Sequence, residues 1–177
     1  MKKTLLSASA ATIIFGLAAC GSTNESGTVE ETASETEAVA EVPTRPVFTG
    51  VEGGNIAVSG YDVTSYFTGE GVPVEGSADH SVEYGGAVYH FASAENATKF
   101  EADPAAFVPQ YGGHCAWAMS NGKLAPGDAT LAKVVDGKLY LNFNADVQKT
   151  WLGDIPGFIE KSEAAWPTIP DDAKFGA

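Results

Sequence analysis

Residues 82–104 read VEYGGAVYHFASAENATKFEADP. Apolar and polar residues alternate on both sides of Gly85-Gly86, and this pattern predicts a tight hairpin because two glycines accept the positive φ angles that such turns require. Ser93 is the expected N-cap of a helix that runs to about Ala102 and ends before Pro104. Its expected buried stripe consists of Ala94, Ala97 and Phe100.

A second stretch, KVVDGKLYLNFNADVQKTWL at residues 133–152, predicts another hairpin, around Asp136-Gly137. Asn144 is the expected cap of a helix over 145–152. Pro156 is expected to open a last helix, in which Phe158, Ile159 and Trp166 are buried. Shorter helical turns are expected at 61–67, with Asp62 as a cap, at 105–108 and at 115–120. The predicted fold class is α+β, with a small antiparallel sheet of β-hairpins and several short helices. No internal repeat is apparent.

The first 19 residues have the layout of a secretory signal peptide. Lys2 and Lys3 precede an uncharged apolar run, which is shorter than a transmembrane helix requires and is not followed by a basic stop-transfer segment. The run ends in Leu-Ala-Ala-Cys at 17–20, which resembles the lipobox of bacterial lipoproteins. We therefore expect acylation at Cys20 and a membrane anchor that depends on the buried lipid chains. Gly21 resembles the sorting pattern of enteric bacteria for the outer membrane, which implies a location facing the periplasm.

Residues 20–46 are expected to form a disordered tether, because they are polar, acidic and free of aromatic residues. The globular domain is expected at 47–168, where aromatic residues become frequent, and a loose tail at 169–177. Removing residues 1–19 leaves 8 Lys and Arg against 23 Asp and Glu, a formal net charge of −15. This charge argues against nucleic acid as a partner and against an electrostatic hold on anionic lipids. We expect a monomer.

Several motifs resemble the YHS domain, a family named for its Tyr-His-Ser signature. Here the signature residues are Tyr89, His90 and Ser93, within GAVYHFAS at 86–93, followed by KFEADP at 99–104. PQYGGHCAWA at 109–118 and DGKLYLNFN at 136–144 are similar to a longer subgroup of exported, stand-alone YHS proteins. The resemblance covers about residues 55–167. It implies a small α+β fold and a role with metal, since YHS domains occur beside heavy-metal transport ATPases and in some oxygenases.

The sequence departs from the family at its cysteines. Many YHS domains carry the motifs Asp-Pro-Val-Cys and Phe-Cys-Ser-x-x-Cys. The matching positions here are Thr64 or its neighbours, Ala92 and Asn96, and none has a thiol. The family's usual site for soft metals is therefore absent from this chain.

Cys115 is the one cysteine left once Cys20 carries lipid, so the mature chain cannot form an internal disulfide. If 115–119 is helical, Cys115 and Met119 lie on one face, and a thiolate with a thioether favours Cu(I). His114 is a candidate third ligand, and His90 a fourth if the first hairpin folds over this loop. The first hypothesis is therefore a metal-handling lipoprotein with a copper ion at Cys115, His114, Met119 and His90.

Two other hypotheses remain open. Cysteine and methionine are common core residues, so the same positions also fit a non-catalytic structural or interaction lipoprotein with Cys115 in its core. A cysteine-dependent enzyme is the third hypothesis, although no resolving cysteine is present and the adjacent His114 would usually point away from the thiol. His80 is expected in a surface loop, and packing and helix capping explain Tyr89 and Ser93.

Overall fold

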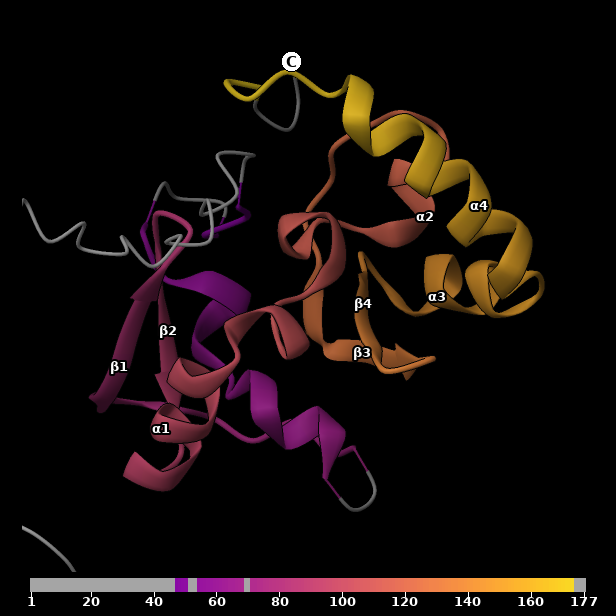
Figure 1. Cartoon of the computed structure of the whole chain (residues 1–177). Helices are drawn as coiled ribbons and strands as arrows, with labels where there is room; N and C mark the ends of the chain where they lie inside the picture. Colours follow the sequence, from indigo (N-terminus) through magenta and orange to yellow (C-terminus); the bar gives the residue numbers. More distant parts are fainter. Residues whose placement is uncertain (1–46, 51–53, 69–70, 174–177) are drawn as a thin grey trace, which may run out of the picture. The chain divides into compact units, whose positions relative to one another are not determined.

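The computed structural model describes residues 47–50, 54–68 and 71–173. The expected signal peptide, Cys20 and the tether lie outside these residues. No helix among the described residues has the length and apolarity needed to cross a membrane. The main elements in chain order are β1 (Ser77–Tyr84), β2 (Ala87–Phe91), α1 (Ala94–Ala102), α2 (Ala116–Met119), β3 (Asp128–Val135), β4 (Lys138–Asn142), α3 (Ala145–Leu152) and α4 (Ile155–Ala165) (Figure 1).

The α+β class is confirmed. Both hairpins form as expected, β1 against β2 and β3 against β4, but each is a separate two-stranded antiparallel sheet within the described part of the chain. Strands β1 and β3 begin five residues earlier than the sequence suggested. Their pairing is irregular between Ser77 and Ser81 and between Asp128 and Lys133. Such irregularities break the simple alternation on which a sequence reading depends.

The expected caps are present. The Ser93 hydroxyl accepts the Asn96 N–H at 3.2 Å, and Asn144 Oδ1 accepts the Val147 N–H at 2.9 Å. Phe100 is fully buried and Ala97 half-buried, but Ala94 is exposed, which corrects the predicted stripe. It is the first residue of α1, where the helix has not yet reached the core.

The C-terminal helix begins at Ile155, one residue before Pro156, with Asp154 as its cap. Its expected core residues Phe158, Ile159 and Trp166 are half-buried rather than buried. They pack against a cluster of buried side chains, hereafter the second core cluster, which also contacts Ile169. Residues 166–168 form a further 3₁₀ turn, so the chain stays packed past Pro167. The members of the second core cluster are Tyr111, Ala116, Met119, Tyr140 and Trp151.

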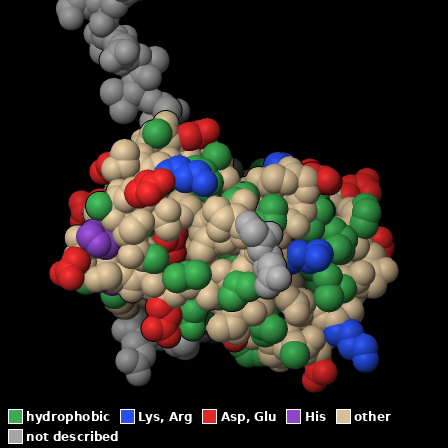
Figure 2. All heavy atoms as spheres, turned by 90° about the horizontal axis from the view of Figure 1, so that it is seen from below, with side chains coloured by type: hydrophobic (Ala, Val, Ile, Leu, Met, Phe, Trp, Pro, Cys, Tyr) green, Lys and Arg blue, Asp and Glu red, His purple; other side chains and the backbone are tan. Residues whose placement is uncertain are grey.

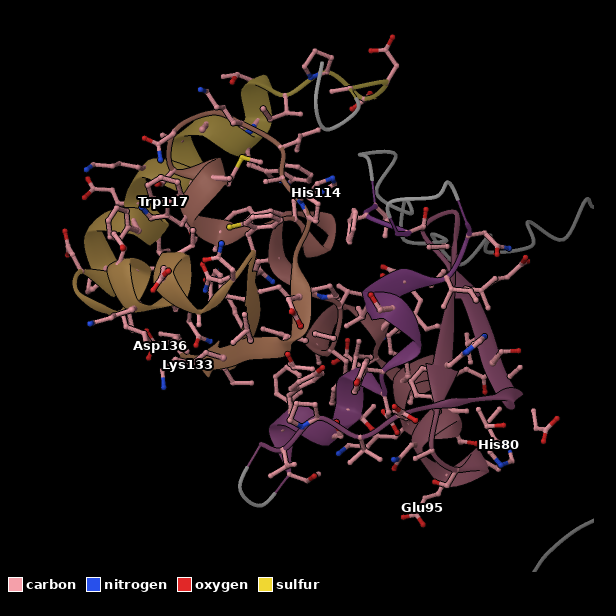
Figure 3. The ribbon with its side chains drawn as sticks, turned by 180° about the vertical axis from the view of Figure 1, so that it is seen from behind. His80, Glu95, His114, Trp117, Lys133 and Asp136 are labelled. Carbon is pink, nitrogen blue, oxygen red and sulfur yellow. The ribbon has the colours of Figure 1, made fainter. Side chains whose placement is uncertain are left out.

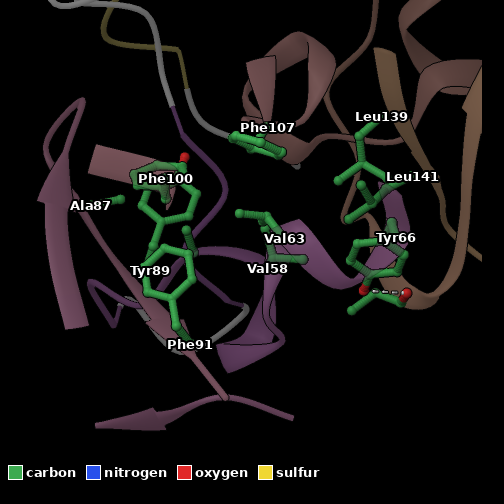
Figure 4. Close-up of a cluster of buried hydrophobic side chains, with 12 residues drawn as sticks. Val58, Val63, Tyr66, Ala87, Tyr89, Phe91, Phe100, Phe107, Leu139 and Leu141 are labelled. Atoms are coloured by element: carbon green, nitrogen blue, oxygen red, sulfur yellow. Dashed lines mark hydrogen bonds between the residues drawn. The ribbon is translucent and has the colours of Figure 1, made fainter. Parts of the chain in front are cut away.

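Buried side chains from both hairpins form another cluster, hereafter the first core cluster. Phe91 and Phe100 pack with ring centroids 5.0 Å apart, and Leu139 and Leu141 of β4 belong to the same cluster (Figure 4). The Tyr66 hydroxyl donates to the Ala129 carbonyl at 2.8 Å, which ties the segment before β1 to β3. The two hairpins therefore share one core.

The same order of elements occurs twice, in residues 56–107 and again in 109–158. Each copy begins with a 3₁₀ turn, η1 (Ala57–Gly60) or η4 (Gln110–Gly113), and continues with a short helix, η2 (Val63–Phe67) or α2. A hairpin and a capped helix then follow in each. We call these two copies the first and second repeat.

The backbone of the opening turns agrees closely between the repeats. Val58 and Ser59 have φ, ψ of 51°, 32° and 52°, 27°, while Tyr111 and Gly112 have 56°, 33° and 61°, 23°. A glycine with φ of 81° or 82° ends each turn. This left-handed conformation is uncommon for residues other than glycine, so its repetition over successive residues is specific.

Hydrogen bonds repeat as well. The Asp62 N–H donates to the Val74 carbonyl at 2.8 Å, and the Cys115 N–H donates to the Ala125 carbonyl at 2.9 Å. Parallel bridges join Ile56 to Val88 and Pro109 to Leu139. The chain thus contains an internal structural repeat, and the expectation that it has none is wrong. Side chains recur at a spacing of 51 residues as well, including Gly86 and Gly137, Tyr89 and Tyr140, Asp103 and Asp154, and Phe107 and Phe158.

Candidate functional site

Cys115 is the N-cap of α2 and is 1% exposed. Its backbone is fixed on two sides, by the bond to Ala125 and by a parallel bridge to Leu141 of β4. Its sulfur lies 3.9 Å from the Oδ1 atom of Asn142, a fully buried residue at the end of β4. The thiol is thus held inside the domain, with an amide as its polar neighbour.

The Asn142 side chain is only partly satisfied. Its Nδ2 atom is buried and has no hydrogen-bond partner among the described residues, and the same holds for Nε1 of Trp151. A buried donor without a partner costs about 1–3 kcal/mol. Since the two ends of an amide are assigned from the surrounding hydrogen bonds, a turned Asn142 would present Nδ2 to the Cys115 sulfur.

His114 is 3% exposed and lies between aromatic rings. Its ring centroid is 5.8 Å from that of Phe48 and 6.4 Å from that of Trp166. Its Nδ1 atom is 2.9 Å from the Tyr111 carbonyl oxygen. Burial lowers the pKa of His114 despite this hydrogen bond, so the imidazole is neutral at pH 7 and Nδ1–H is the donor.

His114 and Cys115 point to different surroundings. The backbone at His114 is extended, with ψ of 159°, and consecutive side chains of an extended chain leave on opposite sides. His114 accordingly contacts Phe48 and Trp166, whereas the Cys115 sulfur faces Asn142.

Met119 is fully buried in the second core cluster. Its N–H donates to the Cys115 carbonyl at 3.0 Å, so the two residues are joined by a single helical turn. Cys115 itself has N-cap rather than helical geometry, with ψ of 119°. The helix of 115–120 expected from the sequence is therefore shorter, and the expected common face of Cys115 and Met119 rests on one turn.

His90 lies on β2, half-buried, and lines a cavity of about 560 Å³ together with Ser59, Tyr61 and Glu75. Neither Cys115, His114 nor Met119 lines this cavity. His80, expected in a loop, is part of β1 and lies well apart from His114 (Figure 3). The described part of the chain contains no group of three or more His, Cys, Asp or Glu side chains that could hold a metal ion.

Sequence reasoning recognised Asp62 only as a helix cap, but it links three segments. The side chain is fully buried, and its Oδ1 accepts the Thr64 N–H at 2.9 Å and the Thr64 hydroxyl at 2.7 Å. Its Oδ2 accepts the Ala92 N–H at 2.9 Å and the Asn96 amide at 2.7 Å. The cap position is readable from sequence, whereas the bonds to Ala92 and Asn96 depend on tertiary contact.

The partners of Asp62 are among the positions that the resemblance matches to the family's cysteines, namely Thr64 or its neighbours, Ala92 and Asn96. Thr64, Ala92 and Asn96 surround a carboxylate there, and every one of its four bonds comes from a protein donor. Such a hydrogen-bonded carboxylate offers no soft ligand. The residues present therefore do not fit the soft-metal site that the family implies at this position.

Comparison with known proteins supports the resemblance. The model of the YHS domain family matches residues 69–111, which span β1, β2 and α1 of the first repeat. No curated protein and no solved structure matches the chain. The YHS resemblance predicted from the sequence is thereby confirmed for this segment.

Proposed function

We propose, on the premise that residues 69–111 form a YHS domain, that the chain is a lipid-anchored envelope protein whose domain is a non-catalytic module for binding another protein. Cys115 belongs to its core. The anchor is the acylated Cys20, and the acidic segment 20–46 gives the domain reach from the outer membrane into the periplasm.

The burial of Cys115 supports its assignment to the core and the non-catalytic part of this proposal. A reactive or metal-exchanging thiol needs access and an activating neighbour, whereas this thiol is 1% exposed and faces an amide. A nucleophilic cysteine also needs a base, and the His114 ring packs against Phe48 and Trp166 while the Cys115 thiol faces Asn142. Enzymatic use of Cys115 therefore has no support in its surroundings.

Thiol reactivity tests the core assignment. In the full chain carrying Cys20→Ser, Cys115 is the one thiol, and we expect a maleimide to modify it at least about 100-fold more slowly in the native protein than in urea. The reason is that modification requires the second repeat to open. Native modification as fast as that in urea would overturn the proposal.

The anchor is tested separately. Wild-type protein expressed in a bacterial host is expected to incorporate a labelled fatty acid and to sediment with membranes, while Cys20→Ser loses both properties. Label that persists in Cys20→Ser would exclude acylation at this cysteine.

Copper handling is the second candidate, and the state of His114 favours it. A neutral imidazole with one nitrogen held by a backbone carbonyl is the arrangement found in metal-binding histidines. Cys115 and Met119 are the two soft donors nearest in sequence, but the Cys115 sulfur faces Asn142, so one of the two side chains, His114 or Cys115, would have to turn for both to bind one ion. A Cu(I) titration against a competing chelator tests this candidate. Stoichiometric binding that is lost in Cys115→Ala and weakened in Met119→Leu would support it, and binding equal to that of Cys115→Ala would exclude it.

A further inference from the structure

A second cavity, of about 340 Å³, lies between the opening turn of the first repeat and the start of β3. This volume is within the range of small-molecule sites, about 300–1,000 Å³. Thr49, Gly50 and Gly54, which line the cavity at His90, do not line this one. The described residues of its wall are Phe48, Ser59, Tyr61, Phe143 and the segment 126–130.

Three aromatic side chains contribute to this wall. Phe48 is buried and is fixed by contact with the His114 ring, with 5.8 Å between the centroids. Tyr61 is half-buried, and Phe143, the residue after β4, is 50% exposed. Aromatic rings attract cations to their electron-rich faces, and groups of such rings are typical binding sites of quaternary ammonium ligands.

Asp128, the first residue of β3, supplies a negative charge beside these rings. Its Oδ1 accepts the Thr130 N–H at 2.8 Å and the Thr130 hydroxyl at 2.7 Å, which orients the carboxylate, while its Oδ2 has no hydrogen bond within the described part of the chain. Burial raises the pKa of Tyr66, and Tyr61 and Asp128 raise it further, so both groups lie near the Tyr66 hydroxyl. An oriented carboxylate oxygen is therefore available to a cation close to Tyr61.

The backbone of this wall is fixed against the core. A Cβ atom at Gly127 would meet the Gly113 carbonyl oxygen and, at 2.7 Å, the Cβ atom of Leu141, so only glycine fits here. Ala129 is buried, and its carbonyl accepts the Tyr66 hydroxyl. A ligand would thus meet a preformed surface, which lowers the entropic cost of binding.

We propose that this cavity binds a quaternary ammonium group, the cationic end of compounds such as choline. The methyl groups contact Phe48, Tyr61 and Phe143, and the positive charge faces Oδ2 of Asp128. The methyl groups also bury apolar area, which a sodium ion cannot do. This binding site goes beyond the proposed protein-binding function and does not depend on it.

The charge of the chain favours a cation over an anion. Asp128 lines the cavity, and no lysine or arginine among the described residues does. Residues 20–177 carry a formal net charge of −15. Figure 2 shows one face of the domain, on which acidic side chains are spread among the other types and basic ones are fewer. A net negative surface raises the local concentration of cations, while the rings select those that carry methyl groups.

Choline itself is the probe. We would titrate choline chloride, at constant ionic strength, into ¹⁵N-labelled residues 20–177 with Cys20→Ser, a protein that contains the whole compact unit 40–177. We expect saturable shifts of the amide signals of Ser59, Asp128, Thr130 and Phe143. The absence of saturable shifts at these positions up to tens of millimolar choline would overturn the site.

A neutral isostere of choline, in which carbon replaces the ammonium nitrogen, separates charge from shape. It is expected to bind at least about 10-fold more weakly, because it keeps the methyl contacts but loses the attraction to the rings and the carboxylate. Equal binding of the two compounds would contradict recognition of an ammonium group.

Variants assign the binding to this cavity. Asp128→Asn keeps an acceptor for Thr130 but removes the charge, and it should weaken choline binding at least about 5-fold. Asp79→Asn, an equal charge change on the exposed face of β1, should leave the affinity within about 2-fold. Phe143→Ala removes one of the three rings and should weaken binding at least about 3-fold. Equal affinities of the Asp128→Asn and Asp79→Asn proteins, or an unchanged affinity in Phe143→Ala, would overturn the site.

The ammonium group has two sources, dissolved compounds and the headgroup of phosphatidylcholine. Sedimentation of the same protein with phosphatidylcholine vesicles that free choline reverses would assign the headgroup, and choline binding without sedimentation would assign a dissolved compound. Both results support the site, and phosphatidylglycerol vesicles are the control. Fast native alkylation of Cys115 would overturn the proposed function and leave this site unaffected.

Discussion

Asp62 and Cys115 occupy the same position in the two repeats. Each is separated from three left-handed residues by one extended residue and precedes a short helix. Each also donates its N–H to the segment before the next strand, at 2.8 Å to Val74 or 2.9 Å to Ala125. The surroundings of the side chains differ. Asp62 accepts four hydrogen bonds, whereas the Cys115 sulfur has one long contact, with Asn142.

The Asp62 carboxylate is predicted to be a major source of stability in the first repeat. Asp62→Ala removes the acceptor for bonds from Thr64, Ala92 and Asn96, and it leaves the buried donors of Thr64 and the partly buried donors of the other two residues unpaired. We expect a loss of about 3 kcal/mol or more in the free energy of unfolding, measured by urea denaturation.

Asp128→Ala provides the matched control. Asp128 Oδ1 also accepts an N–H and a hydroxyl from the residue two positions on, Thr130, but these bonds are exposed. We expect Asp128→Ala to lower the free energy of unfolding by about 1 kcal/mol or less. Equal costs for the two substitutions would show that Asp62 acts only as a local cap.

Replacing Cys115 by aspartate, the residue at the equivalent position of the first repeat, is predicted to destabilise the protein. Cys115→Asp places a carboxylate where the counterparts of Thr64 and Asn96 are Trp117 and Val147, so a turned Asn142 amide is the one side-chain donor that the described residues place beside it, against the two side-chain donors that Asp62 has. Burying a charge without such partners is costly, so the variant should unfold at a lower urea concentration than Cys115→Ala. A Cys115→Asp protein more stable than Cys115→Ala would mean that donors reach this position.

The left-handed turn of the first repeat is predicted to be strained at Ser59. Its φ is 52°, and glycine stands at the corresponding position, Gly112. Ser59→Gly should therefore raise the free energy of unfolding by about 0.5 kcal/mol, after allowance for the greater freedom of glycine in the unfolded chain. Gly112→Ser should lower it. A loss of stability in both variants would contradict the strain argument at Ser59.

The stability of the domain is predicted to fall as the pH drops below about 6.5, because of His114. Burial lowers its pKa in the folded state, so the unfolded chain binds the proton first as the pH falls. The stability that neutral His114 contributes is fully present above pH 6.5, the pKa of histidine in the unfolded chain. It is lost progressively as the pH falls from there to the lower pKa of His114 in the folded state. The slope from this group is at most about 1.4 kcal/mol per pH unit.

Urea denaturation between pH 5 and 8 measures this slope. His114→Gln should be less stable overall but should flatten the pH dependence, since the other titrating groups remain. An unchanged slope in His114→Gln would assign the pH dependence to other residues.

Much of the fold could be predicted from local patterns. The glycine pair at 85–86 and Asp136-Gly137 marked both hairpins, and Ser93 and Asn144 marked the helix starts, because turns and caps depend on residues within a few positions of each other. The early starts of β1 and β3 were missed because irregular pairing breaks the alternation. The exposure of Ala94 and the half-burial of Trp166 also depend on how far each helix reaches into the core.

The candidate site was less predictable. Cys115, His114 and Met119 are adjacent in sequence, but the direction of each side chain depends on the extended backbone at His114 and the single turn after Cys115. His90 belongs to a cavity with Tyr61 and Glu75, residues that no sequence motif joins to it.

The amino-acid sequence by itself determined the α+β class, the two hairpins, their capped helices and the YHS resemblance, because these depend on short-range patterns. The sequence also carries part of the repeat, since Tyr89, Asp103 and Phe107 recur 51 residues later as Tyr140, Asp154 and Phe158. Only the tertiary structure decided that Asp62 and Cys115 stand at one position of the two copies, because repeated φ and ψ angles in the opening turns are compatible with different side chains. What each position can do chemically then depends on the donors that surround it after folding.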